Sequence, residues 1–112
     1  MNYIPRIAHE ELEVLVTSFP VTAILGPRQC GKSTLVKEYL KSRIDGLYLD
    51  LQKESDREKT RNPEQFFTYN KDKLICLDEI QYVPDLFSSL RSLIDEDRRP
   101  GRFIILGSAS RD

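Results

Sequence analysis

The stretch GPRQCGKST, residues 26–34, decides the fold expected for this chain. It follows the apolar run VTAIL at 21–25 and precedes the segment LVKEYL at 35–40, which has helical periodicity. The stretch matches the pattern GxxxxGK[ST], in which glycines let backbone N–H groups turn toward phosphate oxygens at a helix N-terminus. The flanking strand and helix favour a phosphate-binding loop over the alternative, a glycine-rich turn with an incidental lysine.

Two residues of this loop are expected to carry its special chemistry. Lys32 is expected to reach the β- and γ-phosphates of a nucleotide, and the Ser33 hydroxyl to bind Mg²⁺. Main-chain amides supply further contacts, so the whole stretch belongs to the expected binding site. Its residues are Gly26, Pro27, Arg28, Gln29, Cys30, Gly31, Lys32, Ser33 and Thr34.

A pair of carboxylates follows a second apolar run. LICLDEIQ at 74–81 places Asp78 and Glu79 at the carboxyl end of a buried strand. Asp78 is expected to hold Mg²⁺, directly or through water, and Glu79 to accept a proton from an attacking water or to orient it. Two carboxylates that cap the next turn are the alternative. Their position after an apolar strand, downstream of the glycine loop, favours the catalytic role.

A third apolar run, FIILGSAS at 103–110, ends in small hydroxyl residues. Ser108 is expected at the same sheet edge, between the glycine loop and the carboxylates if its strand is inserted there. In that place its hydroxyl would sense the γ-phosphate. A simple loop is the competing interpretation, and it weighs more heavily for Ser110.

Apolar runs alternate with helical periodicities along the chain. The patterns predict strands at 21–25, 46–51, 74–77 and 103–106, and helices over 12–19, from residue 32, over 63–69 and over 83–94. Residues 52–62 are charged and aperiodic, which predicts a surface loop, and 98–101 predict a turn. Short apolar strands separated by helices indicate an α/β fold with a parallel sheet covered on both faces. In such a sheet, ligands bind at the carboxyl ends of the strands.

The bulk composition describes one ordinary globular domain. The chain has 112 residues, of which 39% are hydrophobic and 31% are charged, and its net charge is −1. This balance gives no support for nucleic acid or an anionic membrane as a partner. No apolar run approaches the ~20 residues that span a bilayer, and we see no secretory-signal pattern at the start. The two cysteines form no metal-type pair, so a reduced, cytoplasmic setting is expected.

The motifs GPRQCGKST, LDEIQ and GSAS, with the helix VPDLFSSLRSLIDED between the last two, carry a family resemblance. The chain resembles the N-terminal ATPase core of bacterial and archaeal AAA_14-type ATPases, and the resemblance covers nearly its whole length. It implies an additional-strand P-loop NTPase fold, AAA-like, with sheet order 5-1-4-3-2 and with ATP and Mg²⁺ as ligands. It also implies roles for five residues. Lys32 and Ser33 match the Walker A pair, Asp78 and Glu79 the Walker B pair, and Ser108 the sensor.

The end of the chain departs from that family. Similar proteins run on for several hundred residues and commonly carry a DUF4143 domain at the C-terminus, whereas this chain stops at Asp112. Residues 1–112 are therefore expected to be a partial ATPase domain, an N-terminal fragment without its last strand and attached domain. In the implied order the strand at 21–25 becomes an edge, which predicts self-association or a homo-oligomer through that edge. Cys30 stands where the family often has valine, a change that the loop should tolerate.

Several other polar and charged residues resemble functional groups. Asn70-Lys71-Asp72-Lys73 resembles a guanine-reading signature, but its aspartate is one position early and precedes a strand, which argues against a GTPase. Arg98, Arg99 and Arg102 precede the fourth strand, at the amino end of the sheet, and are interpreted as a solvated turn. Arg111 follows that strand and remains the candidate for an arginine finger within this chain.

Three functions fit these residues to different degrees. The leading hypothesis is Mg²⁺-dependent ATP hydrolysis that drives a conformational change in an attached domain. A nucleotide-binding scaffold module without turnover is the alternative for a chain that lacks the last strand. A small-molecule kinase would share the glycine loop, but the Glu79 base beside Asp78 and the lack of a recognisable arginine-rich lid argue against it.

Overall fold

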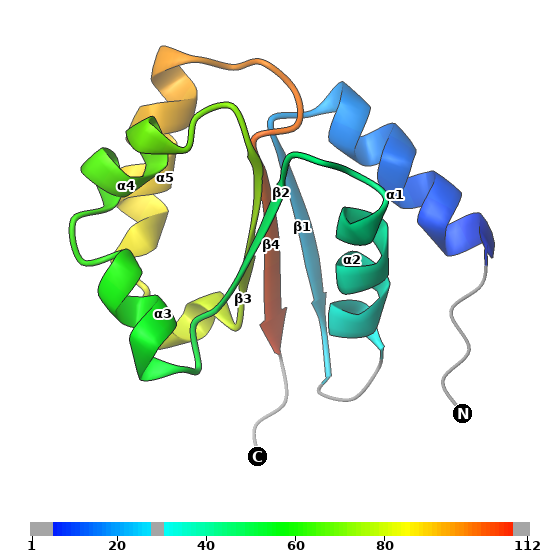
Figure 1. Ribbon diagram of the computed structural model, residues 1–112, viewed down its shortest axis with the longest axis horizontal. Helices are drawn as coiled ribbons and strands as arrows, with labels where there is room; N and C mark the ends of the chain where they lie inside the picture. The colour runs from blue at the N-terminus through cyan, green and yellow to red at the C-terminus, as the bar shows by residue number, and fades with distance from the viewer. Residues whose placement is uncertain (1–5, 28–30, 109–112) are drawn as a thin grey trace.

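A four-stranded parallel sheet forms the centre of the molecule, and helices cover both of its faces (Figure 1). The structure is a computed structural model that describes residues 6–27 and 31–108. One face carries two helices, α1 (Arg6–Ser18) and α2 (Lys32–Lys41). The other carries three, α3 (Glu54–Lys59), α4 (Pro63–Tyr69) and α5 (Leu86–Glu96). The predicted α/β fold, with a parallel sheet covered on both faces, is confirmed.

The strand order is β1-β4-β3-β2, so the fourth strand lies between the first and the third. The strands are β1 (Val21–Gly26), β2 (Gly46–Asp50), β3 (Leu74–Asp78) and β4 (Phe103–Ser108). All pairs are parallel, with Gly26 opposite Ser108 and Asp50 opposite Asp78. The carboxyl ends of the strands therefore lie along one edge of the sheet. This arrangement confirms the order that the resemblance implies for strands 1 to 4.

Strand β3 contributes to both halves of the hydrophobic core, because successive strand side chains point to opposite faces. Its Ile75 and Leu77 pack in the cluster that contains α5, while Leu74 and Cys76 pack in the cluster that contains α1 and α2. All five residues of the strand are buried. Burial on both faces explains why LICL is a continuous apolar run without alternation.

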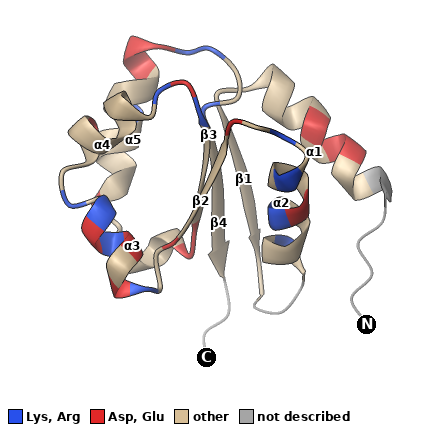
Figure 2. Cartoon of the chain, in the orientation of Figure 1, with Lys and Arg blue, Asp and Glu red and all other residues tan. Residues whose placement is uncertain are grey.

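Charged residues lie on the helices, in the loops and at strand ends, and strands β1 and β4 carry none (Figure 2). Lysines and arginines are interspersed with acidic residues, in keeping with the net charge of −1. Within residues 6–27 and 31–108, no helix has both the length and the apolar character needed to cross a membrane.

The segment predicted as a surface loop, residues 52–62, contains the helix α3. Polar contacts hold this helix to the end of β2. The Asp56 carboxylate accepts the N–H of Asp50 at 2.8 Å, and Nη1 of Arg57 donates to the carbonyl of Leu51 at 3.0 Å. The loop prediction was wrong because α3 buries no residue and so has no apolar stripe to reveal it.

The turn before β4 is solvated only in part. Arg98 and Arg99 are exposed, as predicted. Arg102, in contrast, is only 6% exposed, and its Nη1 donates to the carbonyls of Leu93 at 2.8 Å and Asp97 at 3.0 Å. Those carbonyls lie at the C-terminus of α5, where helical donors run out. The prediction that Arg102 belongs to a solvated turn is therefore wrong, because its guanidinium binds the carbonyl groups at the end of α5.

Candidate functional site

Three segments far apart in the sequence meet at the carboxyl edge of the sheet. These are the start of α2, the end of β3 and the end of β4. Hydrogen bonds join them: Ser33 donates to Asp78, Lys32 to Ser108, and Ser108 to Glu79. The structure thus brings the predicted residues of the three motifs into one site.

The N-terminus of α2 has the backbone geometry expected of a phosphate loop. Gly31 caps the helix with a φ of 87°, in the left-handed region that favours glycine. Lys32 follows and is only 6% exposed. Its Nζ donates to the carbonyl of Pro27 at 3.2 Å and to Oγ of Ser108 at 3.5 Å. A lysine so confined keeps its ammonium directed at the loop and the sheet edge, where the helix dipole is also positive.

Asp78 is the buried carboxylate of the site, with an exposure of 4%. Its Oδ2 accepts a hydrogen bond from Oγ of Ser33 at 2.7 Å and another from the hydroxyl of Tyr48. Its Oδ1 is buried and has no hydrogen-bond partner among residues 6–27 and 31–108. Such an oxygen costs about 1–3 kcal/mol in a folded protein unless a ligand satisfies it.

Glu79 has a left-handed backbone, with φ of 58° and ψ of 48°. This conformation is uncommon outside glycine and costs on the order of 1–3 kcal/mol, so such residues concentrate at functional sites. The Glu79 carboxylate accepts hydrogen bonds from Oγ of Ser108 at 3.1 Å and from Nε2 of Gln81 at 2.6 Å. The left-handed turn at Glu79 therefore leaves its carboxylate at the sheet edge, where it contacts Ser108.

A cavity of about 120 Å³ lies over these groups. It is lined by Gly31, Lys32, Ser33, Thr34 and Glu79. Its lining thus includes an ammonium, a helix N-terminus, two hydroxyls and a carboxylate. The ammonium, the helix N-terminus and the hydroxyls suit a phosphate anion, and the carboxylate suits a water molecule that attacks it.

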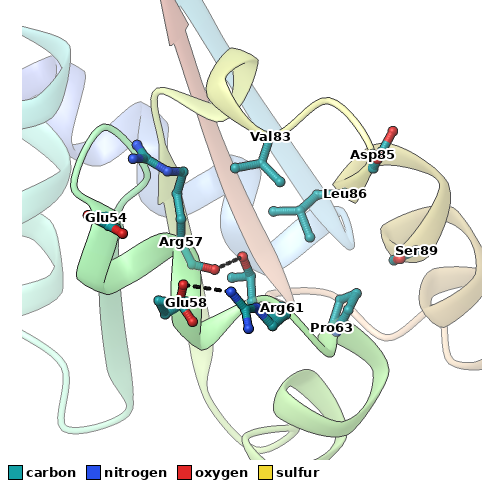
Figure 3. Close-up of a pocket in the computed structure, with 10 residues that line it drawn as sticks. Glu54, Arg57, Glu58, Arg61, Pro63, Val83, Asp85, Leu86 and Ser89 are labelled. Carbon is teal, nitrogen blue, oxygen red and sulfur yellow. Dashed lines mark hydrogen bonds and ion pairs between the residues drawn. The ribbon is translucent and has the colours of Figure 1, made fainter.

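A larger hollow of about 380 Å³ lies elsewhere, between α3 and the start of α5 (Figure 3). Its charged residues are largely satisfied by near neighbours. Arg61 pairs with Glu58 at 2.9 Å, and the Arg57 guanidinium points away from the hollow (Figure 3) toward the carbonyl of Leu51. None of the predicted site residues lines this hollow. The sheet edge therefore remains the candidate site.

Two residues of the site were missed by the sequence analysis, Tyr48 and Gln81. Tyr48 lies on β2 and donates to Asp78. Burial first, and then its hydrogen bond to Asp78, raise the pKa of Tyr48, so its hydroxyl remains a donor at neutral pH. Gln81 lies in the single turn η1 (Ile80–Tyr82). A tyrosine within an otherwise apolar strand was the only signal available for the first, and the LDEIQ motif for the second.

Some predicted residues fall outside the part of the chain that the structure describes. They are Arg28, Gln29 and Cys30 of the glycine loop, and Ser110 and Arg111 after β4. The rest of the predicted set lies at the site: Gly26 ends β1, the carbonyl of Pro27 accepts from Lys32, and Thr34 lines the small cavity.

The strand order β1-β4-β3-β2, a glycine loop that leads into α2 and an Asp-Glu pair on a neighbouring strand define a P-loop NTPase-like protein of the AAA type. The model of the AAA_14 family, described as "AAA domain", matches residues 18–112, and the chain belongs to this family. The resemblance inferred from the motifs is thereby confirmed. Membership indicates a nucleotide-binding activity of the ATPase type.

Two mycobacterial proteins are similar to this chain. They are the uncharacterized protein Rv2008c of Mycobacterium tuberculosis and the uncharacterized protein Mb2031c of Mycobacterium bovis. Each is 41% identical over 93 residues, which make up 83% of this chain and 21% of the relative. The chain thus spans about a fifth of the length of these relatives.

Proposed function

We propose that this chain binds ATP with Mg²⁺ and hydrolyses it, and that turnover drives a conformational change in an attached domain. The observation that supports this most is the hydrogen-bonded series Lys32–Ser108–Glu79 beside the Ser33–Asp78 contact. A cation that suits phosphate and a candidate base for water line one small cavity, and Ser33, which also lines it, bonds to the buried Asp78.

Ser33 and Asp78 fit a magnesium ion that binds together with a nucleotide. The buried Oδ1 of Asp78, which no described residue contacts with a hydrogen bond, and the Ser33 hydroxyl are oxygen ligands of the type that Mg²⁺ prefers. Among the residues that the structure describes, no three His, Cys, Asp or Glu side chains are grouped to hold a metal. Phosphate oxygens would complete the coordination, as is usual for Mg²⁺. When bound, the ion neutralises charge on the phosphates.

Different residues of the chain have different roles in hydrolysis. The Lys32 ammonium and the N-terminal amides of α2 bind the phosphates and offset the charge that spreads over the transferred phosphoryl group. Glu79 accepts a proton from water as the water oxygen bonds to the γ-phosphorus. The bond to the β,γ-bridging oxygen breaks, and ADP and phosphate are the products. Ser108 touches both Lys32 and Glu79, which suits it to sense the γ-phosphate.

Coupling to an attached domain is supported by the length of the relatives, of which this chain matches 21%. A cytoplasmic location, where ATP and Mg²⁺ are available, belongs to the same proposal. The alternative function, nucleotide binding without turnover, makes the same demands on Lys32 and Ser33 but none on Glu79. A measurement of binding alone therefore cannot separate the two functions.

The test combines calorimetric titration of ATP and Mg²⁺ with an assay of ADP release by the full-length protein. Saturable binding and steady ADP release are expected. Binding without release would favour the scaffold function, whereas a well-folded protein that gives no binding heat and no release would refute both functions.

A further inference from the structure

Tyr48 lies on the edge strand β2 but reaches the carboxylate at the centre of the site. It is opposite Cys76 in the parallel register between β2 and β3. Cys76 and Asp78 are two positions apart on β3 and so share one face of the sheet, the face that α2 covers. The half-buried phenol therefore extends along this face, and its hydroxyl donates to Oδ2 of Asp78.

The hydrogen bonds of the Asp78 carboxylate are distributed unevenly. In the part of the chain that the structure describes, the hydroxyls of Tyr48 and Ser33 both donate to Oδ2, while Oδ1 is buried and accepts no hydrogen bond. A carboxylate with a single donor can rotate and exchange its two oxygens. Two donors from different elements, β2 and α2, fix which oxygen is engaged by the protein. They leave the other oxygen available to a ligand.

The ring of Tyr48 is itself held in place. Nζ of Lys37 lies 5.0 Å from the ring centroid, and Lys37 is on α2, one turn beyond Ser33. The ring also packs against the core cluster that contains α1 and α2. Phenylalanine could provide the same packing, so what tyrosine adds at this position is the hydroxyl that donates to Asp78.

We propose that Tyr48 is a positioning residue for the metal-binding carboxylate. Its hydroxyl anchors Oδ2 of Asp78 so that Oδ1 is offered to magnesium or to water bound to it. This inference rests on the proposed function. A phenol is ordinarily protonated at neutral pH, so the Tyr48 hydroxyl has a proton to donate to Asp78.

The test measures ADP affinity of the full-length protein by calorimetry, once with Mg²⁺ and once with EDTA, in the wild type and in Tyr48→Phe. We expect the gain in affinity from magnesium to fall about tenfold in Tyr48→Phe, the lower end of what outer-shell partners contribute to metal sites. Affinity in EDTA should stay within about twofold, because the hydroxyl is not assigned to the phosphates. Tyr69→Phe is the matched control, since Tyr69 is 87% exposed.

Three results would overturn the inference, and they are distinguishable. Equal magnesium gains in Tyr48→Phe and the wild type would show that the hydroxyl does not position Asp78. An equal loss of affinity with Mg²⁺ and with EDTA would assign Tyr48 to the fold of the loop. A wild type that binds no ADP in either buffer would refute the proposed function itself. Circular dichroism melting of each variant checks folding, which phenylalanine should preserve because it keeps the ring.

Discussion

Nζ of Lys32 lies 3.5 Å from Oγ of Ser108, although 76 positions separate the two residues in the chain. Strand order brings them together, because β4 pairs with β1 and ends opposite Gly26. Ser108 in turn donates to Glu79 at the end of the next strand. The start of α2 and the acidic pair are thereby connected through one hydroxyl.

Replacing the buried lysine should weaken nucleotide binding. For Lys32→Ala we expect ATP affinity to fall about 10- to 100-fold, which corresponds to the loss of a charge-assisted hydrogen bond. Calorimetry with Mg²⁺ and ATP measures the effect. Lys41→Ala is the control, because Lys41 is on the same helix, is exposed and pairs with Glu38. Unchanged affinity in Lys32→Ala would contradict the assignment.

Replacing the carboxylate of Glu79 should separate binding from turnover. For Glu79→Gln in the full-length protein we expect ATP affinity within about twofold of the wild type and ADP release reduced about 10²- to 10⁴-fold, the range for loss of a general base. Glu64→Gln, an exposed carboxylate in α4, should match the wild type in both measurements. Parallel loss of affinity and turnover would tell against Glu79 as the base.

Gln81 should affect the rate of hydrolysis more than the affinity for ATP. Its Nε2 holds Oε1 of Glu79 at 2.6 Å, and removing one hydrogen bond of this kind costs about 1 kcal/mol. For Gln81→Ala we expect kcat to fall about 3- to 10-fold with unchanged ATP affinity. Gln65→Ala, at an exposed position of α4, serves as the comparison. An altered affinity together with an unaltered kcat would oppose this role.

Arg102 should contribute to stability and not to nucleotide binding. Loss of its two hydrogen bonds to the end of α5 in Arg102→Met should lower the free energy of unfolding by about 1–3 kcal/mol. Arg98→Met should change it by less than about 0.5 kcal/mol, because Arg98 is exposed and its pair with Asp95 is a surface one. Urea denaturation of both variants gives the comparison. Equal values for the two would show that burial of Arg102 is without consequence.

The pair Arg43–Asp45 should make stability depend on pH in the acid range. The Arg43 guanidinium, 2.8 Å from Asp45, lowers the pKa of that carboxyl below its ordinary value of 3.8. A lowered folded pKa means that the stabilisation is present above the unfolded pKa and is lost as pH falls through the folded one. The stability difference between the wild type and Asp45→Asn should therefore shrink on acidification below pH 3.8. A constant difference across this range would contradict the prediction.

Most of the fold was predictable because its strands can be recognised in the sequence as short continuous apolar runs. Burial on both faces produces runs such as LICL, and a parallel sheet aligns the carboxyl ends of its strands. The placement of Asp78 and Glu79 near Lys32 follows from these two facts. The insertion of β4 between β1 and β3 does not follow from spacing, since nothing in the run FIIL specifies its neighbours. That position came from the resemblance.

The missed features depend on side-chain direction, which periodicity does not encode. Tyr48 reaches Asp78 through the register of β2 on β3, and Gln81 reaches Glu79 because the backbone at Glu79 is left-handed. Arg102 looks like any other arginine of a charged turn until the end of α5 is placed beside it. Such contacts are properties of the assembled structure, and the residue types alone do not reveal them.

The central position of β4 also bears on how the protein is made. During synthesis, β1, β2 and β3 leave the ribosome before residues 103–108 are available to join β1 to β3. Until then β1 has no partner strand and β3 can pair only with β2, so backbone edges stay open, a state prone to aggregation and to capture by chaperones. A nascent chain on a ribosome that is stalled before residue 103 emerges should therefore be sensitive to protease. A nascent chain on a ribosome that is stalled after β4 has emerged should be resistant.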